Sequence, residues 1–88
     1  MSDDCKWAVY LLRCNDGAYY CGATNDVTRR IDQHNKGTAS RYTRGRLPVT
    51  LVAQSRLMSR GQALSLEARV KKAERGMKAA MVEGDEAG

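Results

Sequence analysis

The side chains in this sequence whose chemistry and spacing stand out are Tyr10, Tyr20, Arg30, His34 and Glu67. An arginine can bind phosphate oxygens through two hydrogen bonds, and a carboxylate is a preferred ligand of a hard cation such as Mg²⁺. A histidine has a free pKa near 6.5 and exchanges protons near neutral pH. A tyrosine has a free pKa of about 10, so it needs nearby positive charge or a proton acceptor to act there. Whether these groups can work together depends on the elements that carry them.

The two tyrosines lie in apolar, β-prone runs, residues 7–13 and 18–23, on either side of Asn15-Asp16-Gly17. Such a cluster between such runs is a hairpin signal. A two-residue turn would pair Tyr10 with Ala23 and place the two phenols on opposite faces. A three-residue loop, with a positive φ at its glycine, would pair Tyr10 with Gly22 and place both phenols on one face. In the second case the phenols have room beside them, over a glycine.

A helix is predicted over about 26–36, with N-cap chemistry at 24–26 and Gly37 at its C-terminal end. Its inward face follows the i, i+3, i+4, i+7 pattern, with members Val27, Arg30, Ile31 and His34. Two potential ligands therefore interrupt an apolar stripe, while Arg29 points elsewhere and is predicted to contact nucleic acid.

The last long helix is predicted over about 60–74, with Ser59 as its cap, before a short turn at 77–82. Glu67 lies in the apolar stripe formed by Ala63, Leu66 and Val70. Because burying an unpaired carboxylate is costly, we expect Glu67 to meet a cation or to keep water beside it.

Residues 37–48 read as a loop that contains a short turn, followed by a third strand over 49–57. The loop carries Arg41, Arg44 and Arg46 around Tyr42. We predict phosphate contacts for the arginines, and Tyr42 either belongs to the core or offers a stacking surface for a base.

The whole pattern predicts an α+β fold with a three-stranded antiparallel sheet, flanking helices and the order β-β-α-β-α. At 88 residues the chain has room for one domain, expected over 1–82, with a disordered acidic tail over 83–88. The odd number of cysteines and the absence of a CxxC spacing argue against both a disulfide framework and a cysteine zinc site.

Composition adds only coarse limits on function. The net charge of +5 and the pI near 9.4 mildly favour a phosphate-rich partner. No apolar run approaches the length of a membrane span and no signal-peptide pattern is present, so we expect a soluble, cytoplasmic protein that does not bind membranes.

The triplet Ala8-Val9-Tyr10 followed by Tyr20-Cys21-Gly22 resembles the paired signature of the GIY-YIG endonuclease domain, and most closely its small stand-alone bacterial members. In that family an arginine follows the second glycine by eight residues and, in many members, a histidine comes four residues later. Here these positions hold Arg30 and His34. The departures, Ala8 and Cys21, are expected at packing positions.

Further along the chain, Glu67 stands in the context of the family's divalent-metal ligand. Residues 41–46 and Pro48-Val49 resemble the loop and third strand of the stand-alone members. The likeness runs from Trp7 to about Lys72, which is most of the chain.

The resemblance implies a divalent-metal-dependent DNA endonuclease that hydrolyses phosphodiester bonds, with a family-level link to DNA repair or recombination. A single Mg²⁺ or Mn²⁺ would bind Glu67, Arg30 would bind a nonbridging phosphate oxygen, and a tyrosine would activate water. Which tyrosine acts as the base stays open, as does whether His34 accepts its proton or contacts the phosphate.

So small a chain has no separate domain for reading a long base sequence. We therefore expect low sequence specificity, or selectivity for nicked, branched or single-stranded DNA, with a protein partner as one way to direct it. The runner-up function is a noncatalytic nucleic-acid-binding module on the same fold, and a third is a scaffold subunit. In their ordinary roles the tyrosines would be packing groups, His34 would complement a helix dipole, and Glu67 would form a buried salt bridge with Arg30.

Overall fold

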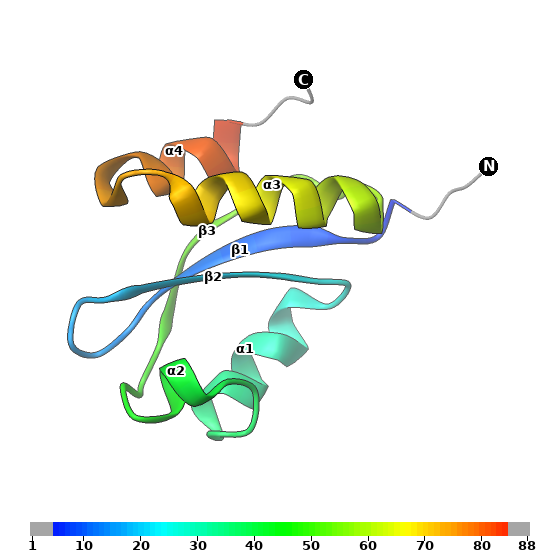
Figure 1. The fold of residues 1–88 in the computed structure, drawn as a ribbon. Coiled ribbons are helices and arrows are strands. Elements are labelled where there is room, and N and C mark those ends of the chain that lie inside the picture. Colours follow the sequence, from blue (N-terminus) through cyan, green and yellow to red (C-terminus); the bar gives the residue numbers. More distant parts are fainter. Residues whose placement is uncertain (1–4, 85–88) are drawn as a thin grey trace.

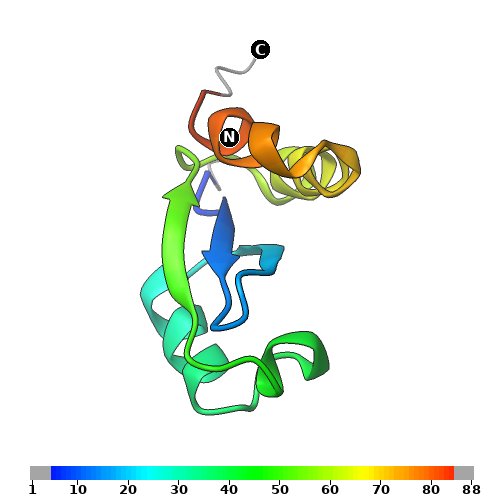
Figure 2. The ribbon, with the colours of Figure 1, turned by 90° about the vertical axis from the view of Figure 1, so that its left-hand side faces the viewer.

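A three-stranded antiparallel sheet with helices on both faces makes up the computed structural model, which describes residues 5–84 (Figure 1). The strands, in the spatial order β2-β1-β3, are β1 (Ala8–Arg13), β2 (Tyr19–Thr24) and β3 (Thr50–Gln54). The helices are α1 (Val27–Asn35), α2 (Arg41–Arg44), α3 (Arg60–Lys72) and α4 (Arg75–Gly84). Figures 1 and 2 show α3 and α4 together on one side of the sheet and α1 and α2 on the other. The predicted fold class and element order are confirmed, and the short helix α2 and the C-terminal helix α4 are additions.

The hairpin β1–β2 has the three-residue loop. The backbone N–H of Gly17 donates to the carbonyl of Cys14 (2.9 Å), and Gly17 has a φ of 88°. Tyr10 pairs with Gly22 and Leu12 pairs with Tyr20. Because side chains alternate along a strand, both phenols lie on the same face, the one that carries α1 and α2.

Two separate clusters of buried side chains lie on the two faces. The cluster under α3 and α4, which we call the apolar core, consists of Val9, Leu11, Cys21, Ala53, Met58, Ala63, Leu66, Val70 and Val82. The cluster under α1 and α2 is smaller, and its buried members are Tyr10, Leu12, Cys14 and Val49. The central strand β1 contributes alternate residues to each cluster.

The helices that position the site begin where the sequence predicts. The Asp26 side chain accepts the backbone N–H of Arg29 (3.1 Å) at the start of α1, and Gly37 follows the helix with a φ of 80°. Ser59 and Gln62 form a capping box at the start of α3. At the other end of α1, the Asn35 side chain is tied to the backbone of Val49 by two hydrogen bonds (2.8 and 3.2 Å).

Three predicted boundaries need correction. The third strand ends at Gln54 and not at Leu57, because the Ser55 hydroxyl, in place of a backbone carbonyl, accepts the N–H of Val9 (2.9 Å). The predicted turn at 77–82 is instead part of α4, where Val82 is buried in the apolar core. Glu83 and Gly84, assigned from the sequence to an acidic tail, are the last residues of α4. The rest of that predicted tail, 85–88, lies outside the described residues.

All three cysteines lie within the described residues. Cys5 is exposed, and Cys14 and Cys21 are buried; all three are unbridged. In the part of the chain that the structure describes, no helix has the length and apolar character needed to cross a membrane.

Candidate active site

A buried chain of three polar side chains links β1, α1 and α2. The hydroxyl of Tyr10 lies 3.0 Å from Nε2 of His34, and Nδ1 of His34 lies 2.8 Å from Oγ1 of Thr43. Tyr10 and His34 are each 1% exposed and Thr43 is fully buried. Because buried polar groups need partners, these two hydrogen bonds fix the relative position of the three elements.

The ring of Tyr10 lies directly over the backbone of Gly22. A Cβ atom at position 22 would be 2.6 Å from Cζ of Tyr10 and closer still to its hydroxyl oxygen. Since real Cβ atoms essentially never approach another heavy atom within 3.0 Å, any side chain at 22 would displace the phenol. This is the physical reason for a glycine opposite Tyr10.

Tyr20 lies between this buried chain and the solvent. Its ring contacts the edge of His34 (centroids 5.0 Å apart) and stacks with Tyr42 (5.9 Å), and it lies 6.3 Å from the ring of Tyr10. Tyr20 is half-buried, whereas Tyr10 is almost inaccessible. The two phenols therefore share a face but differ in their access to water.

Arg30 brings an unpaired hydrogen-bond donor to the same face. Its Nη1 donates to Oε1 of Gln33 (3.0 Å), while its Nε is buried and has no hydrogen-bond partner among the described residues. Arg29, Arg30 and Gln33 line a pocket of about 260 Å³ at the start of α1. A buried donor without an acceptor costs free energy, so an anionic oxygen bound here would be favoured.

Burial sets the protonation states of the central pair. Burial first, and Tyr20 second, raise the pKa of Tyr10 to about 12, although Arg30 opposes the shift. Burial first, and the charge of Arg30 second, lower the pKa of His34 below its usual 6.5. Both groups are therefore neutral at pH 7, and the neutral imidazole can accept a proton.

Glu67 belongs to α3, on the opposite face of the sheet from Arg30. Its Oε2 lies 2.9 Å from Nζ of Lys71, so the expected cation is Lys71 and the alternative of a salt bridge with Arg30 is wrong. This hydrogen bond to Glu67 raises the pKa of Lys71. Burial first, and the charge of Glu67 next, raise the pKa of Cys21 on β2 to about 11. The charge of Glu67 therefore affects the protonation of a side chain on the edge strand β2.

A pocket of about 320 Å³ at this edge of the sheet joins the two faces. It is lined by Tyr19, Tyr20, Cys21, Tyr42, Lys71 and Lys78. Tyr20 and Tyr42 belong to the side of α1 and α2, whereas Lys71, the partner of Glu67, comes from α3. A ligand at the edge of β2 can therefore touch side chains from both faces.

The donor set fits one kind of metal ion. Within residues 5–84, no group of three or more His, Cys, Asp or Glu side chains is placed to hold a metal. Mg²⁺ and similar ions, however, keep several waters and bind through one or two carboxylates together with substrate phosphates. The single carboxylate of Glu67 beside an open pocket fits such an ion, and does not fit a closed all-protein site.

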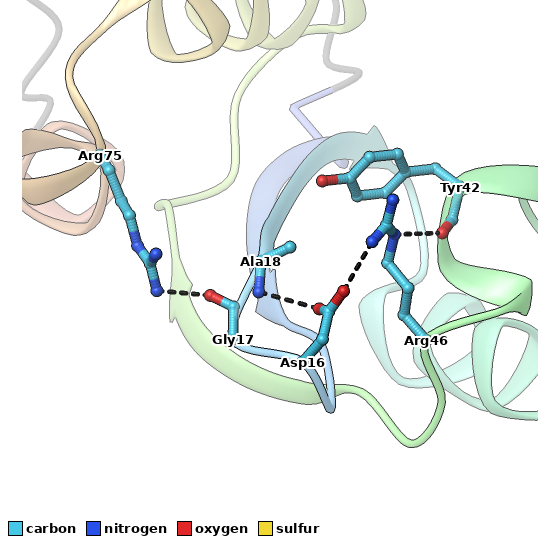
Figure 3. Close-up of polar contacts among 6 residues, drawn as sticks. All are labelled: Asp16, Gly17, Ala18, Tyr42, Arg46 and Arg75. Carbon is cyan, nitrogen blue, oxygen red and sulfur yellow. Dashed lines mark hydrogen bonds and ion pairs between the residues drawn. The ribbon is translucent and has the colours of Figure 1, made fainter.

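The predicted nucleic-acid contacts fall into two groups. Arg29, Arg41 and Arg44 are exposed. Arg46 is instead engaged with the hairpin loop, as Figure 3 shows. Its Nη1 pairs with Oδ2 of Asp16 (2.6 Å), its Nε donates to the carbonyl of Tyr42 (3.0 Å), and its guanidinium lies 4.3 Å from the centre of the Tyr42 ring.

A second arginine holds the same loop from the side of α4 (Figure 3). Arg75 donates to the carbonyl of Gly17, and its guanidinium lies 4.6 Å from the centre of the Tyr19 ring. The loop also closes on itself, because Asp16 accepts the backbone N–H of Ala18 (3.0 Å). The tip of the hairpin is thus held by segments that follow it by many residues.

Sequence reasoning did not identify Thr43 or Lys71. Thr43 lies in a segment without helical or strand periodicity, so no spacing connected it with His34. Lys71 follows Glu67 by four residues on α3, and this i, i+4 spacing is the signal that could have found it.

Comparison with known proteins gives one family. The family model described as the GIY-YIG catalytic domain matches residues 6–80. A UPF0213 protein of Nitratidesulfovibrio vulgaris is 50% identical over 66 residues, which are 75% of this chain and 60% of that protein. This chain therefore matches less than two thirds of that relative's length. A UPF0213 protein of Halobacterium salinarum is 45% identical over 73 residues, 83% of this chain and 95% of that protein.

Two solved structures are similar as well. The solution NMR structure of the UPF0213 protein BH0048 from Bacillus halodurans is 43% identical, with a TM-score of 0.52 over 86% of this chain and 81% of that one. The solution NMR structure of the protein EF2693 from E. faecalis is 34% identical, with a TM-score of 0.58 over 91% of this chain and 85% of that one.

Proposed function

Because the chain belongs to the GIY-YIG family, whose domain is a nuclease domain, we propose that it is a divalent-metal-dependent endonuclease that hydrolyses phosphodiester bonds in DNA. The observation that carries this proposal is the gathering of two phenols, a neutral imidazole and an unpaired guanidinium nitrogen on one face of the hairpin. A packing role alone would not require a buried donor without an acceptor.

Arg30 binds the scissile phosphate in this proposal. Its buried Nε lacks an acceptor among the described residues, and a nonbridging phosphate oxygen would supply one. A guanidinium also stabilises the negative charge that grows on the phosphate in the transition state. The exposed side chains of Arg29, Arg41 and Arg44 contact neighbouring phosphates.

The pair of Tyr10 and His34 accepts the proton of the attacking water. The oxygen of Tyr10 takes the proton from water as its own proton passes to Nε2 of His34, 3.0 Å away. The hydroxyl of Tyr10 already faces a neutral proton acceptor, which supports this assignment. Tyr20, which is half-buried and lines the pocket at β2, positions the phosphate.

Glu67 is the residue that would hold Mg²⁺ or Mn²⁺, because its carboxylate lies beside Lys71, which lines the pocket at β2. The ion, when bound, would offset charge on the scissile phosphate and the leaving oxygen. Tyr42 lines the pocket at β2 and contacts the DNA strand. Arg46 acts through its contact with the Tyr42 ring. We place the activity in the cytoplasm, in DNA repair or recombination. The enzyme either selects nicked, branched or single-stranded DNA or cleaves with low sequence specificity.

The test is nicking of supercoiled plasmid and cleavage of a labelled branched duplex in Mg²⁺ or Mn²⁺. EDTA and Glu67→Gln should abolish product, whereas Glu74→Gln, which removes an exposed carboxylate beyond the end of α3, should cleave like the wild type. DNA binding is followed in parallel by fluorescence anisotropy at several salt concentrations. Salt-sensitive binding without product on any substrate would overturn the nuclease and favour the noncatalytic binding module.

A further inference from the structure

Thr43 makes two hydrogen bonds that together determine where its proton lies. Its Oγ1 lies 3.3 Å from the carbonyl oxygen of Ser40 and 2.8 Å from Nδ1 of His34. A hydroxyl has one proton to donate, and a carbonyl oxygen can only accept. The hydroxyl of Thr43 has the geometry of a donor to Ser40, so the lone pairs of Oγ1 face His34.

This arrangement determines the tautomer of His34. With an acceptor at Nδ1, the imidazole carries its proton on Nδ1 and leaves Nε2 with a free lone pair. The hydroxyl of Tyr10 then donates to Nε2 across 3.0 Å. All the hydrogen bonds of the buried chain point the same way, from Tyr10 through His34 to Thr43 and on to Ser40.

In the opposite tautomer, with the proton on Nε2, fewer of the buried polar groups have a hydrogen-bond partner. Nε2–H would point at the oxygen of Tyr10, and the proton of the Tyr10 hydroxyl would lose its acceptor in a site that is 1% exposed. The Thr43 hydroxyl would have to turn from Ser40 to Nδ1. A buried hydroxyl proton without a partner costs free energy, so the first arrangement is favoured.

We propose that Thr43 is a positioning residue that holds His34 in the Nδ1–H tautomer, so that Nε2 is free to receive the proton of Tyr10. The catalytic meaning of this inference rests on the proposed function, but the tautomer does not. Helix α2 holds Thr43 in this position. The carbonyl of its N-cap residue Ser40 orients the Thr43 hydroxyl, and the Ser40 hydroxyl accepts the N–H of Tyr42 (3.1 Å). The short helix is thus part of the site although it contributes no reacting atom.

The tautomer can be read directly because the chain contains one histidine. In ¹⁵N-histidine-labelled protein, long-range ¹H–¹⁵N correlation distinguishes a protonated Nδ1 from a protonated Nε2. We expect the wild type to carry the proton on Nδ1. A wild type protonated on Nε2 at neutral pH would overturn the inference without any variant being made.

Two variants at position 43 separate tautomer control from packing. Thr43→Val keeps the shape of the side chain and removes the hydroxyl, so Nδ1 loses its acceptor and the Nε2–H tautomer should become populated. Thr43→Ser keeps the hydroxyl and removes a methyl group, so it should retain the Nδ1–H tautomer despite looser packing. An unchanged tautomer in a folded Thr43→Val protein would also overturn the inference.

Cleavage assays test whether the tautomer matters for catalysis. In Thr43→Val we expect kcat to fall about 10²-fold, the scale of one general acid–base interaction, with KM nearly unchanged, and in Thr43→Ser we expect it to be restored. If the wild type cleaves nothing, the proposed function fails while the NMR result still decides the tautomer. If Thr43→Val shifts the tautomer but cleaves like the wild type, the positioning role is wrong.

Discussion

The two faces of the sheet share their strands but are held together by different interactions. Under α3 and α4, β1 contributes Val9 and Leu11 to a contiguous apolar core. Under α1 and α2, the same strand contributes Tyr10, whose hydroxyl begins a buried chain of hydrogen bonds through His34 to Thr43. Burial of apolar area stabilises the fold, while a buried polar chain adds little net stability but fixes positions.

This difference indicates a division of roles. The apolar core can support a face on which a phenol and an imidazole are buried and an arginine nitrogen has no partner within the described chain. Substitutions in the apolar core should therefore lower the free energy of unfolding and leave the chemistry intact. Substitutions around Tyr10 should instead lower cleavage more than they lower the free energy of unfolding.

The largest expected change in stability comes from Leu66→Ala, in the middle of the apolar core. Leu66 is 1% exposed, so the cavity should cost about 2–5 kcal/mol in the free energy of unfolding. Urea denaturation measures this, and the protein that remains folded at low temperature should cleave normally. Leu64→Ala is the matched control, because Leu64 lies on the same helix but is 42% exposed, and should change stability by less than about 0.5 kcal/mol. Equal losses in both variants would contradict the division of roles.

Gly22→Ala tests the other face. The new methyl group would overlap the Tyr10 ring, so we expect a loss of about 1–3 kcal/mol in stability together with a large loss of cleavage. Gly61→Ala is the control, because its Cβ meets nothing within 4 Å and it lies in helix α3, where alanine is favoured by about 0.5–1 kcal/mol. Normal cleavage by Gly22→Ala would show that the position of the Tyr10 ring does not matter to the chemistry.

The pH dependence of stability should also come from the polar face. Folding lowers the pKa of His34, so the unfolded chain binds a proton first as the pH falls below 6.5. The free energy of unfolding contributed by the neutral imidazole is therefore fully present above pH 6.5 and is lost as the pH falls through the lower pKa of the folded state. Urea titrations between about pH 5 and pH 8 would reveal this slope. His34→Gln should flatten it; a slope that persists in that variant has another source.

The smallest expected change in stability is at the edge where the faces meet. Lys71→Met removes an exposed partner of Glu67 and should cost less than about 1 kcal/mol. Because the Lys71 ammonium competes with a cation for the same carboxylate, its loss should tighten Mn²⁺ binding on the order of fivefold, about 1 kcal/mol. An electron paramagnetic resonance titration of free Mn²⁺ measures this without any cleavage. Lys72→Met, an exposed neighbour, is the control; equal affinities in the two variants would separate Lys71 from the metal site.

Periodic patterns predicted the parts of the molecule that depend on local geometry. The 3.6-residue period of the helix placed Arg30, and not Arg29, on the inward face. The loop with Gly17 at positive φ set the register that pairs Tyr10 with Gly22. Both outcomes follow from backbone rules that act over a few residues. The almost wholly apolar run over 7–13 predicts a central strand covered on both faces, which the two clusters confirm, but such a run does not show which helix covers which face.

Contacts between irregular segments could not be predicted in the same way. Nothing in the spacing connects Thr43 with His34, since one side-chain hydrogen bond leaves no period in the sequence. Arg46 looked like its neighbours Arg41 and Arg44, and only the folded loop brings Asp16 to it. The stripe on α3 indicated that Glu67 is half-buried but not that it lies across the sheet from Arg30.

The alternation of β1 restricts how this strand can change over evolution. Inserting or deleting one residue before Tyr10 would turn every side chain to the other face, moving the phenol into the apolar core and Val9 or Leu11 into the site. Both stability and chemistry would be lost in a single step, with no intermediate that keeps either. The strand should therefore vary among descendants by substitution and never by length, and differences in chain length should collect in the segments that do not alternate between the two faces.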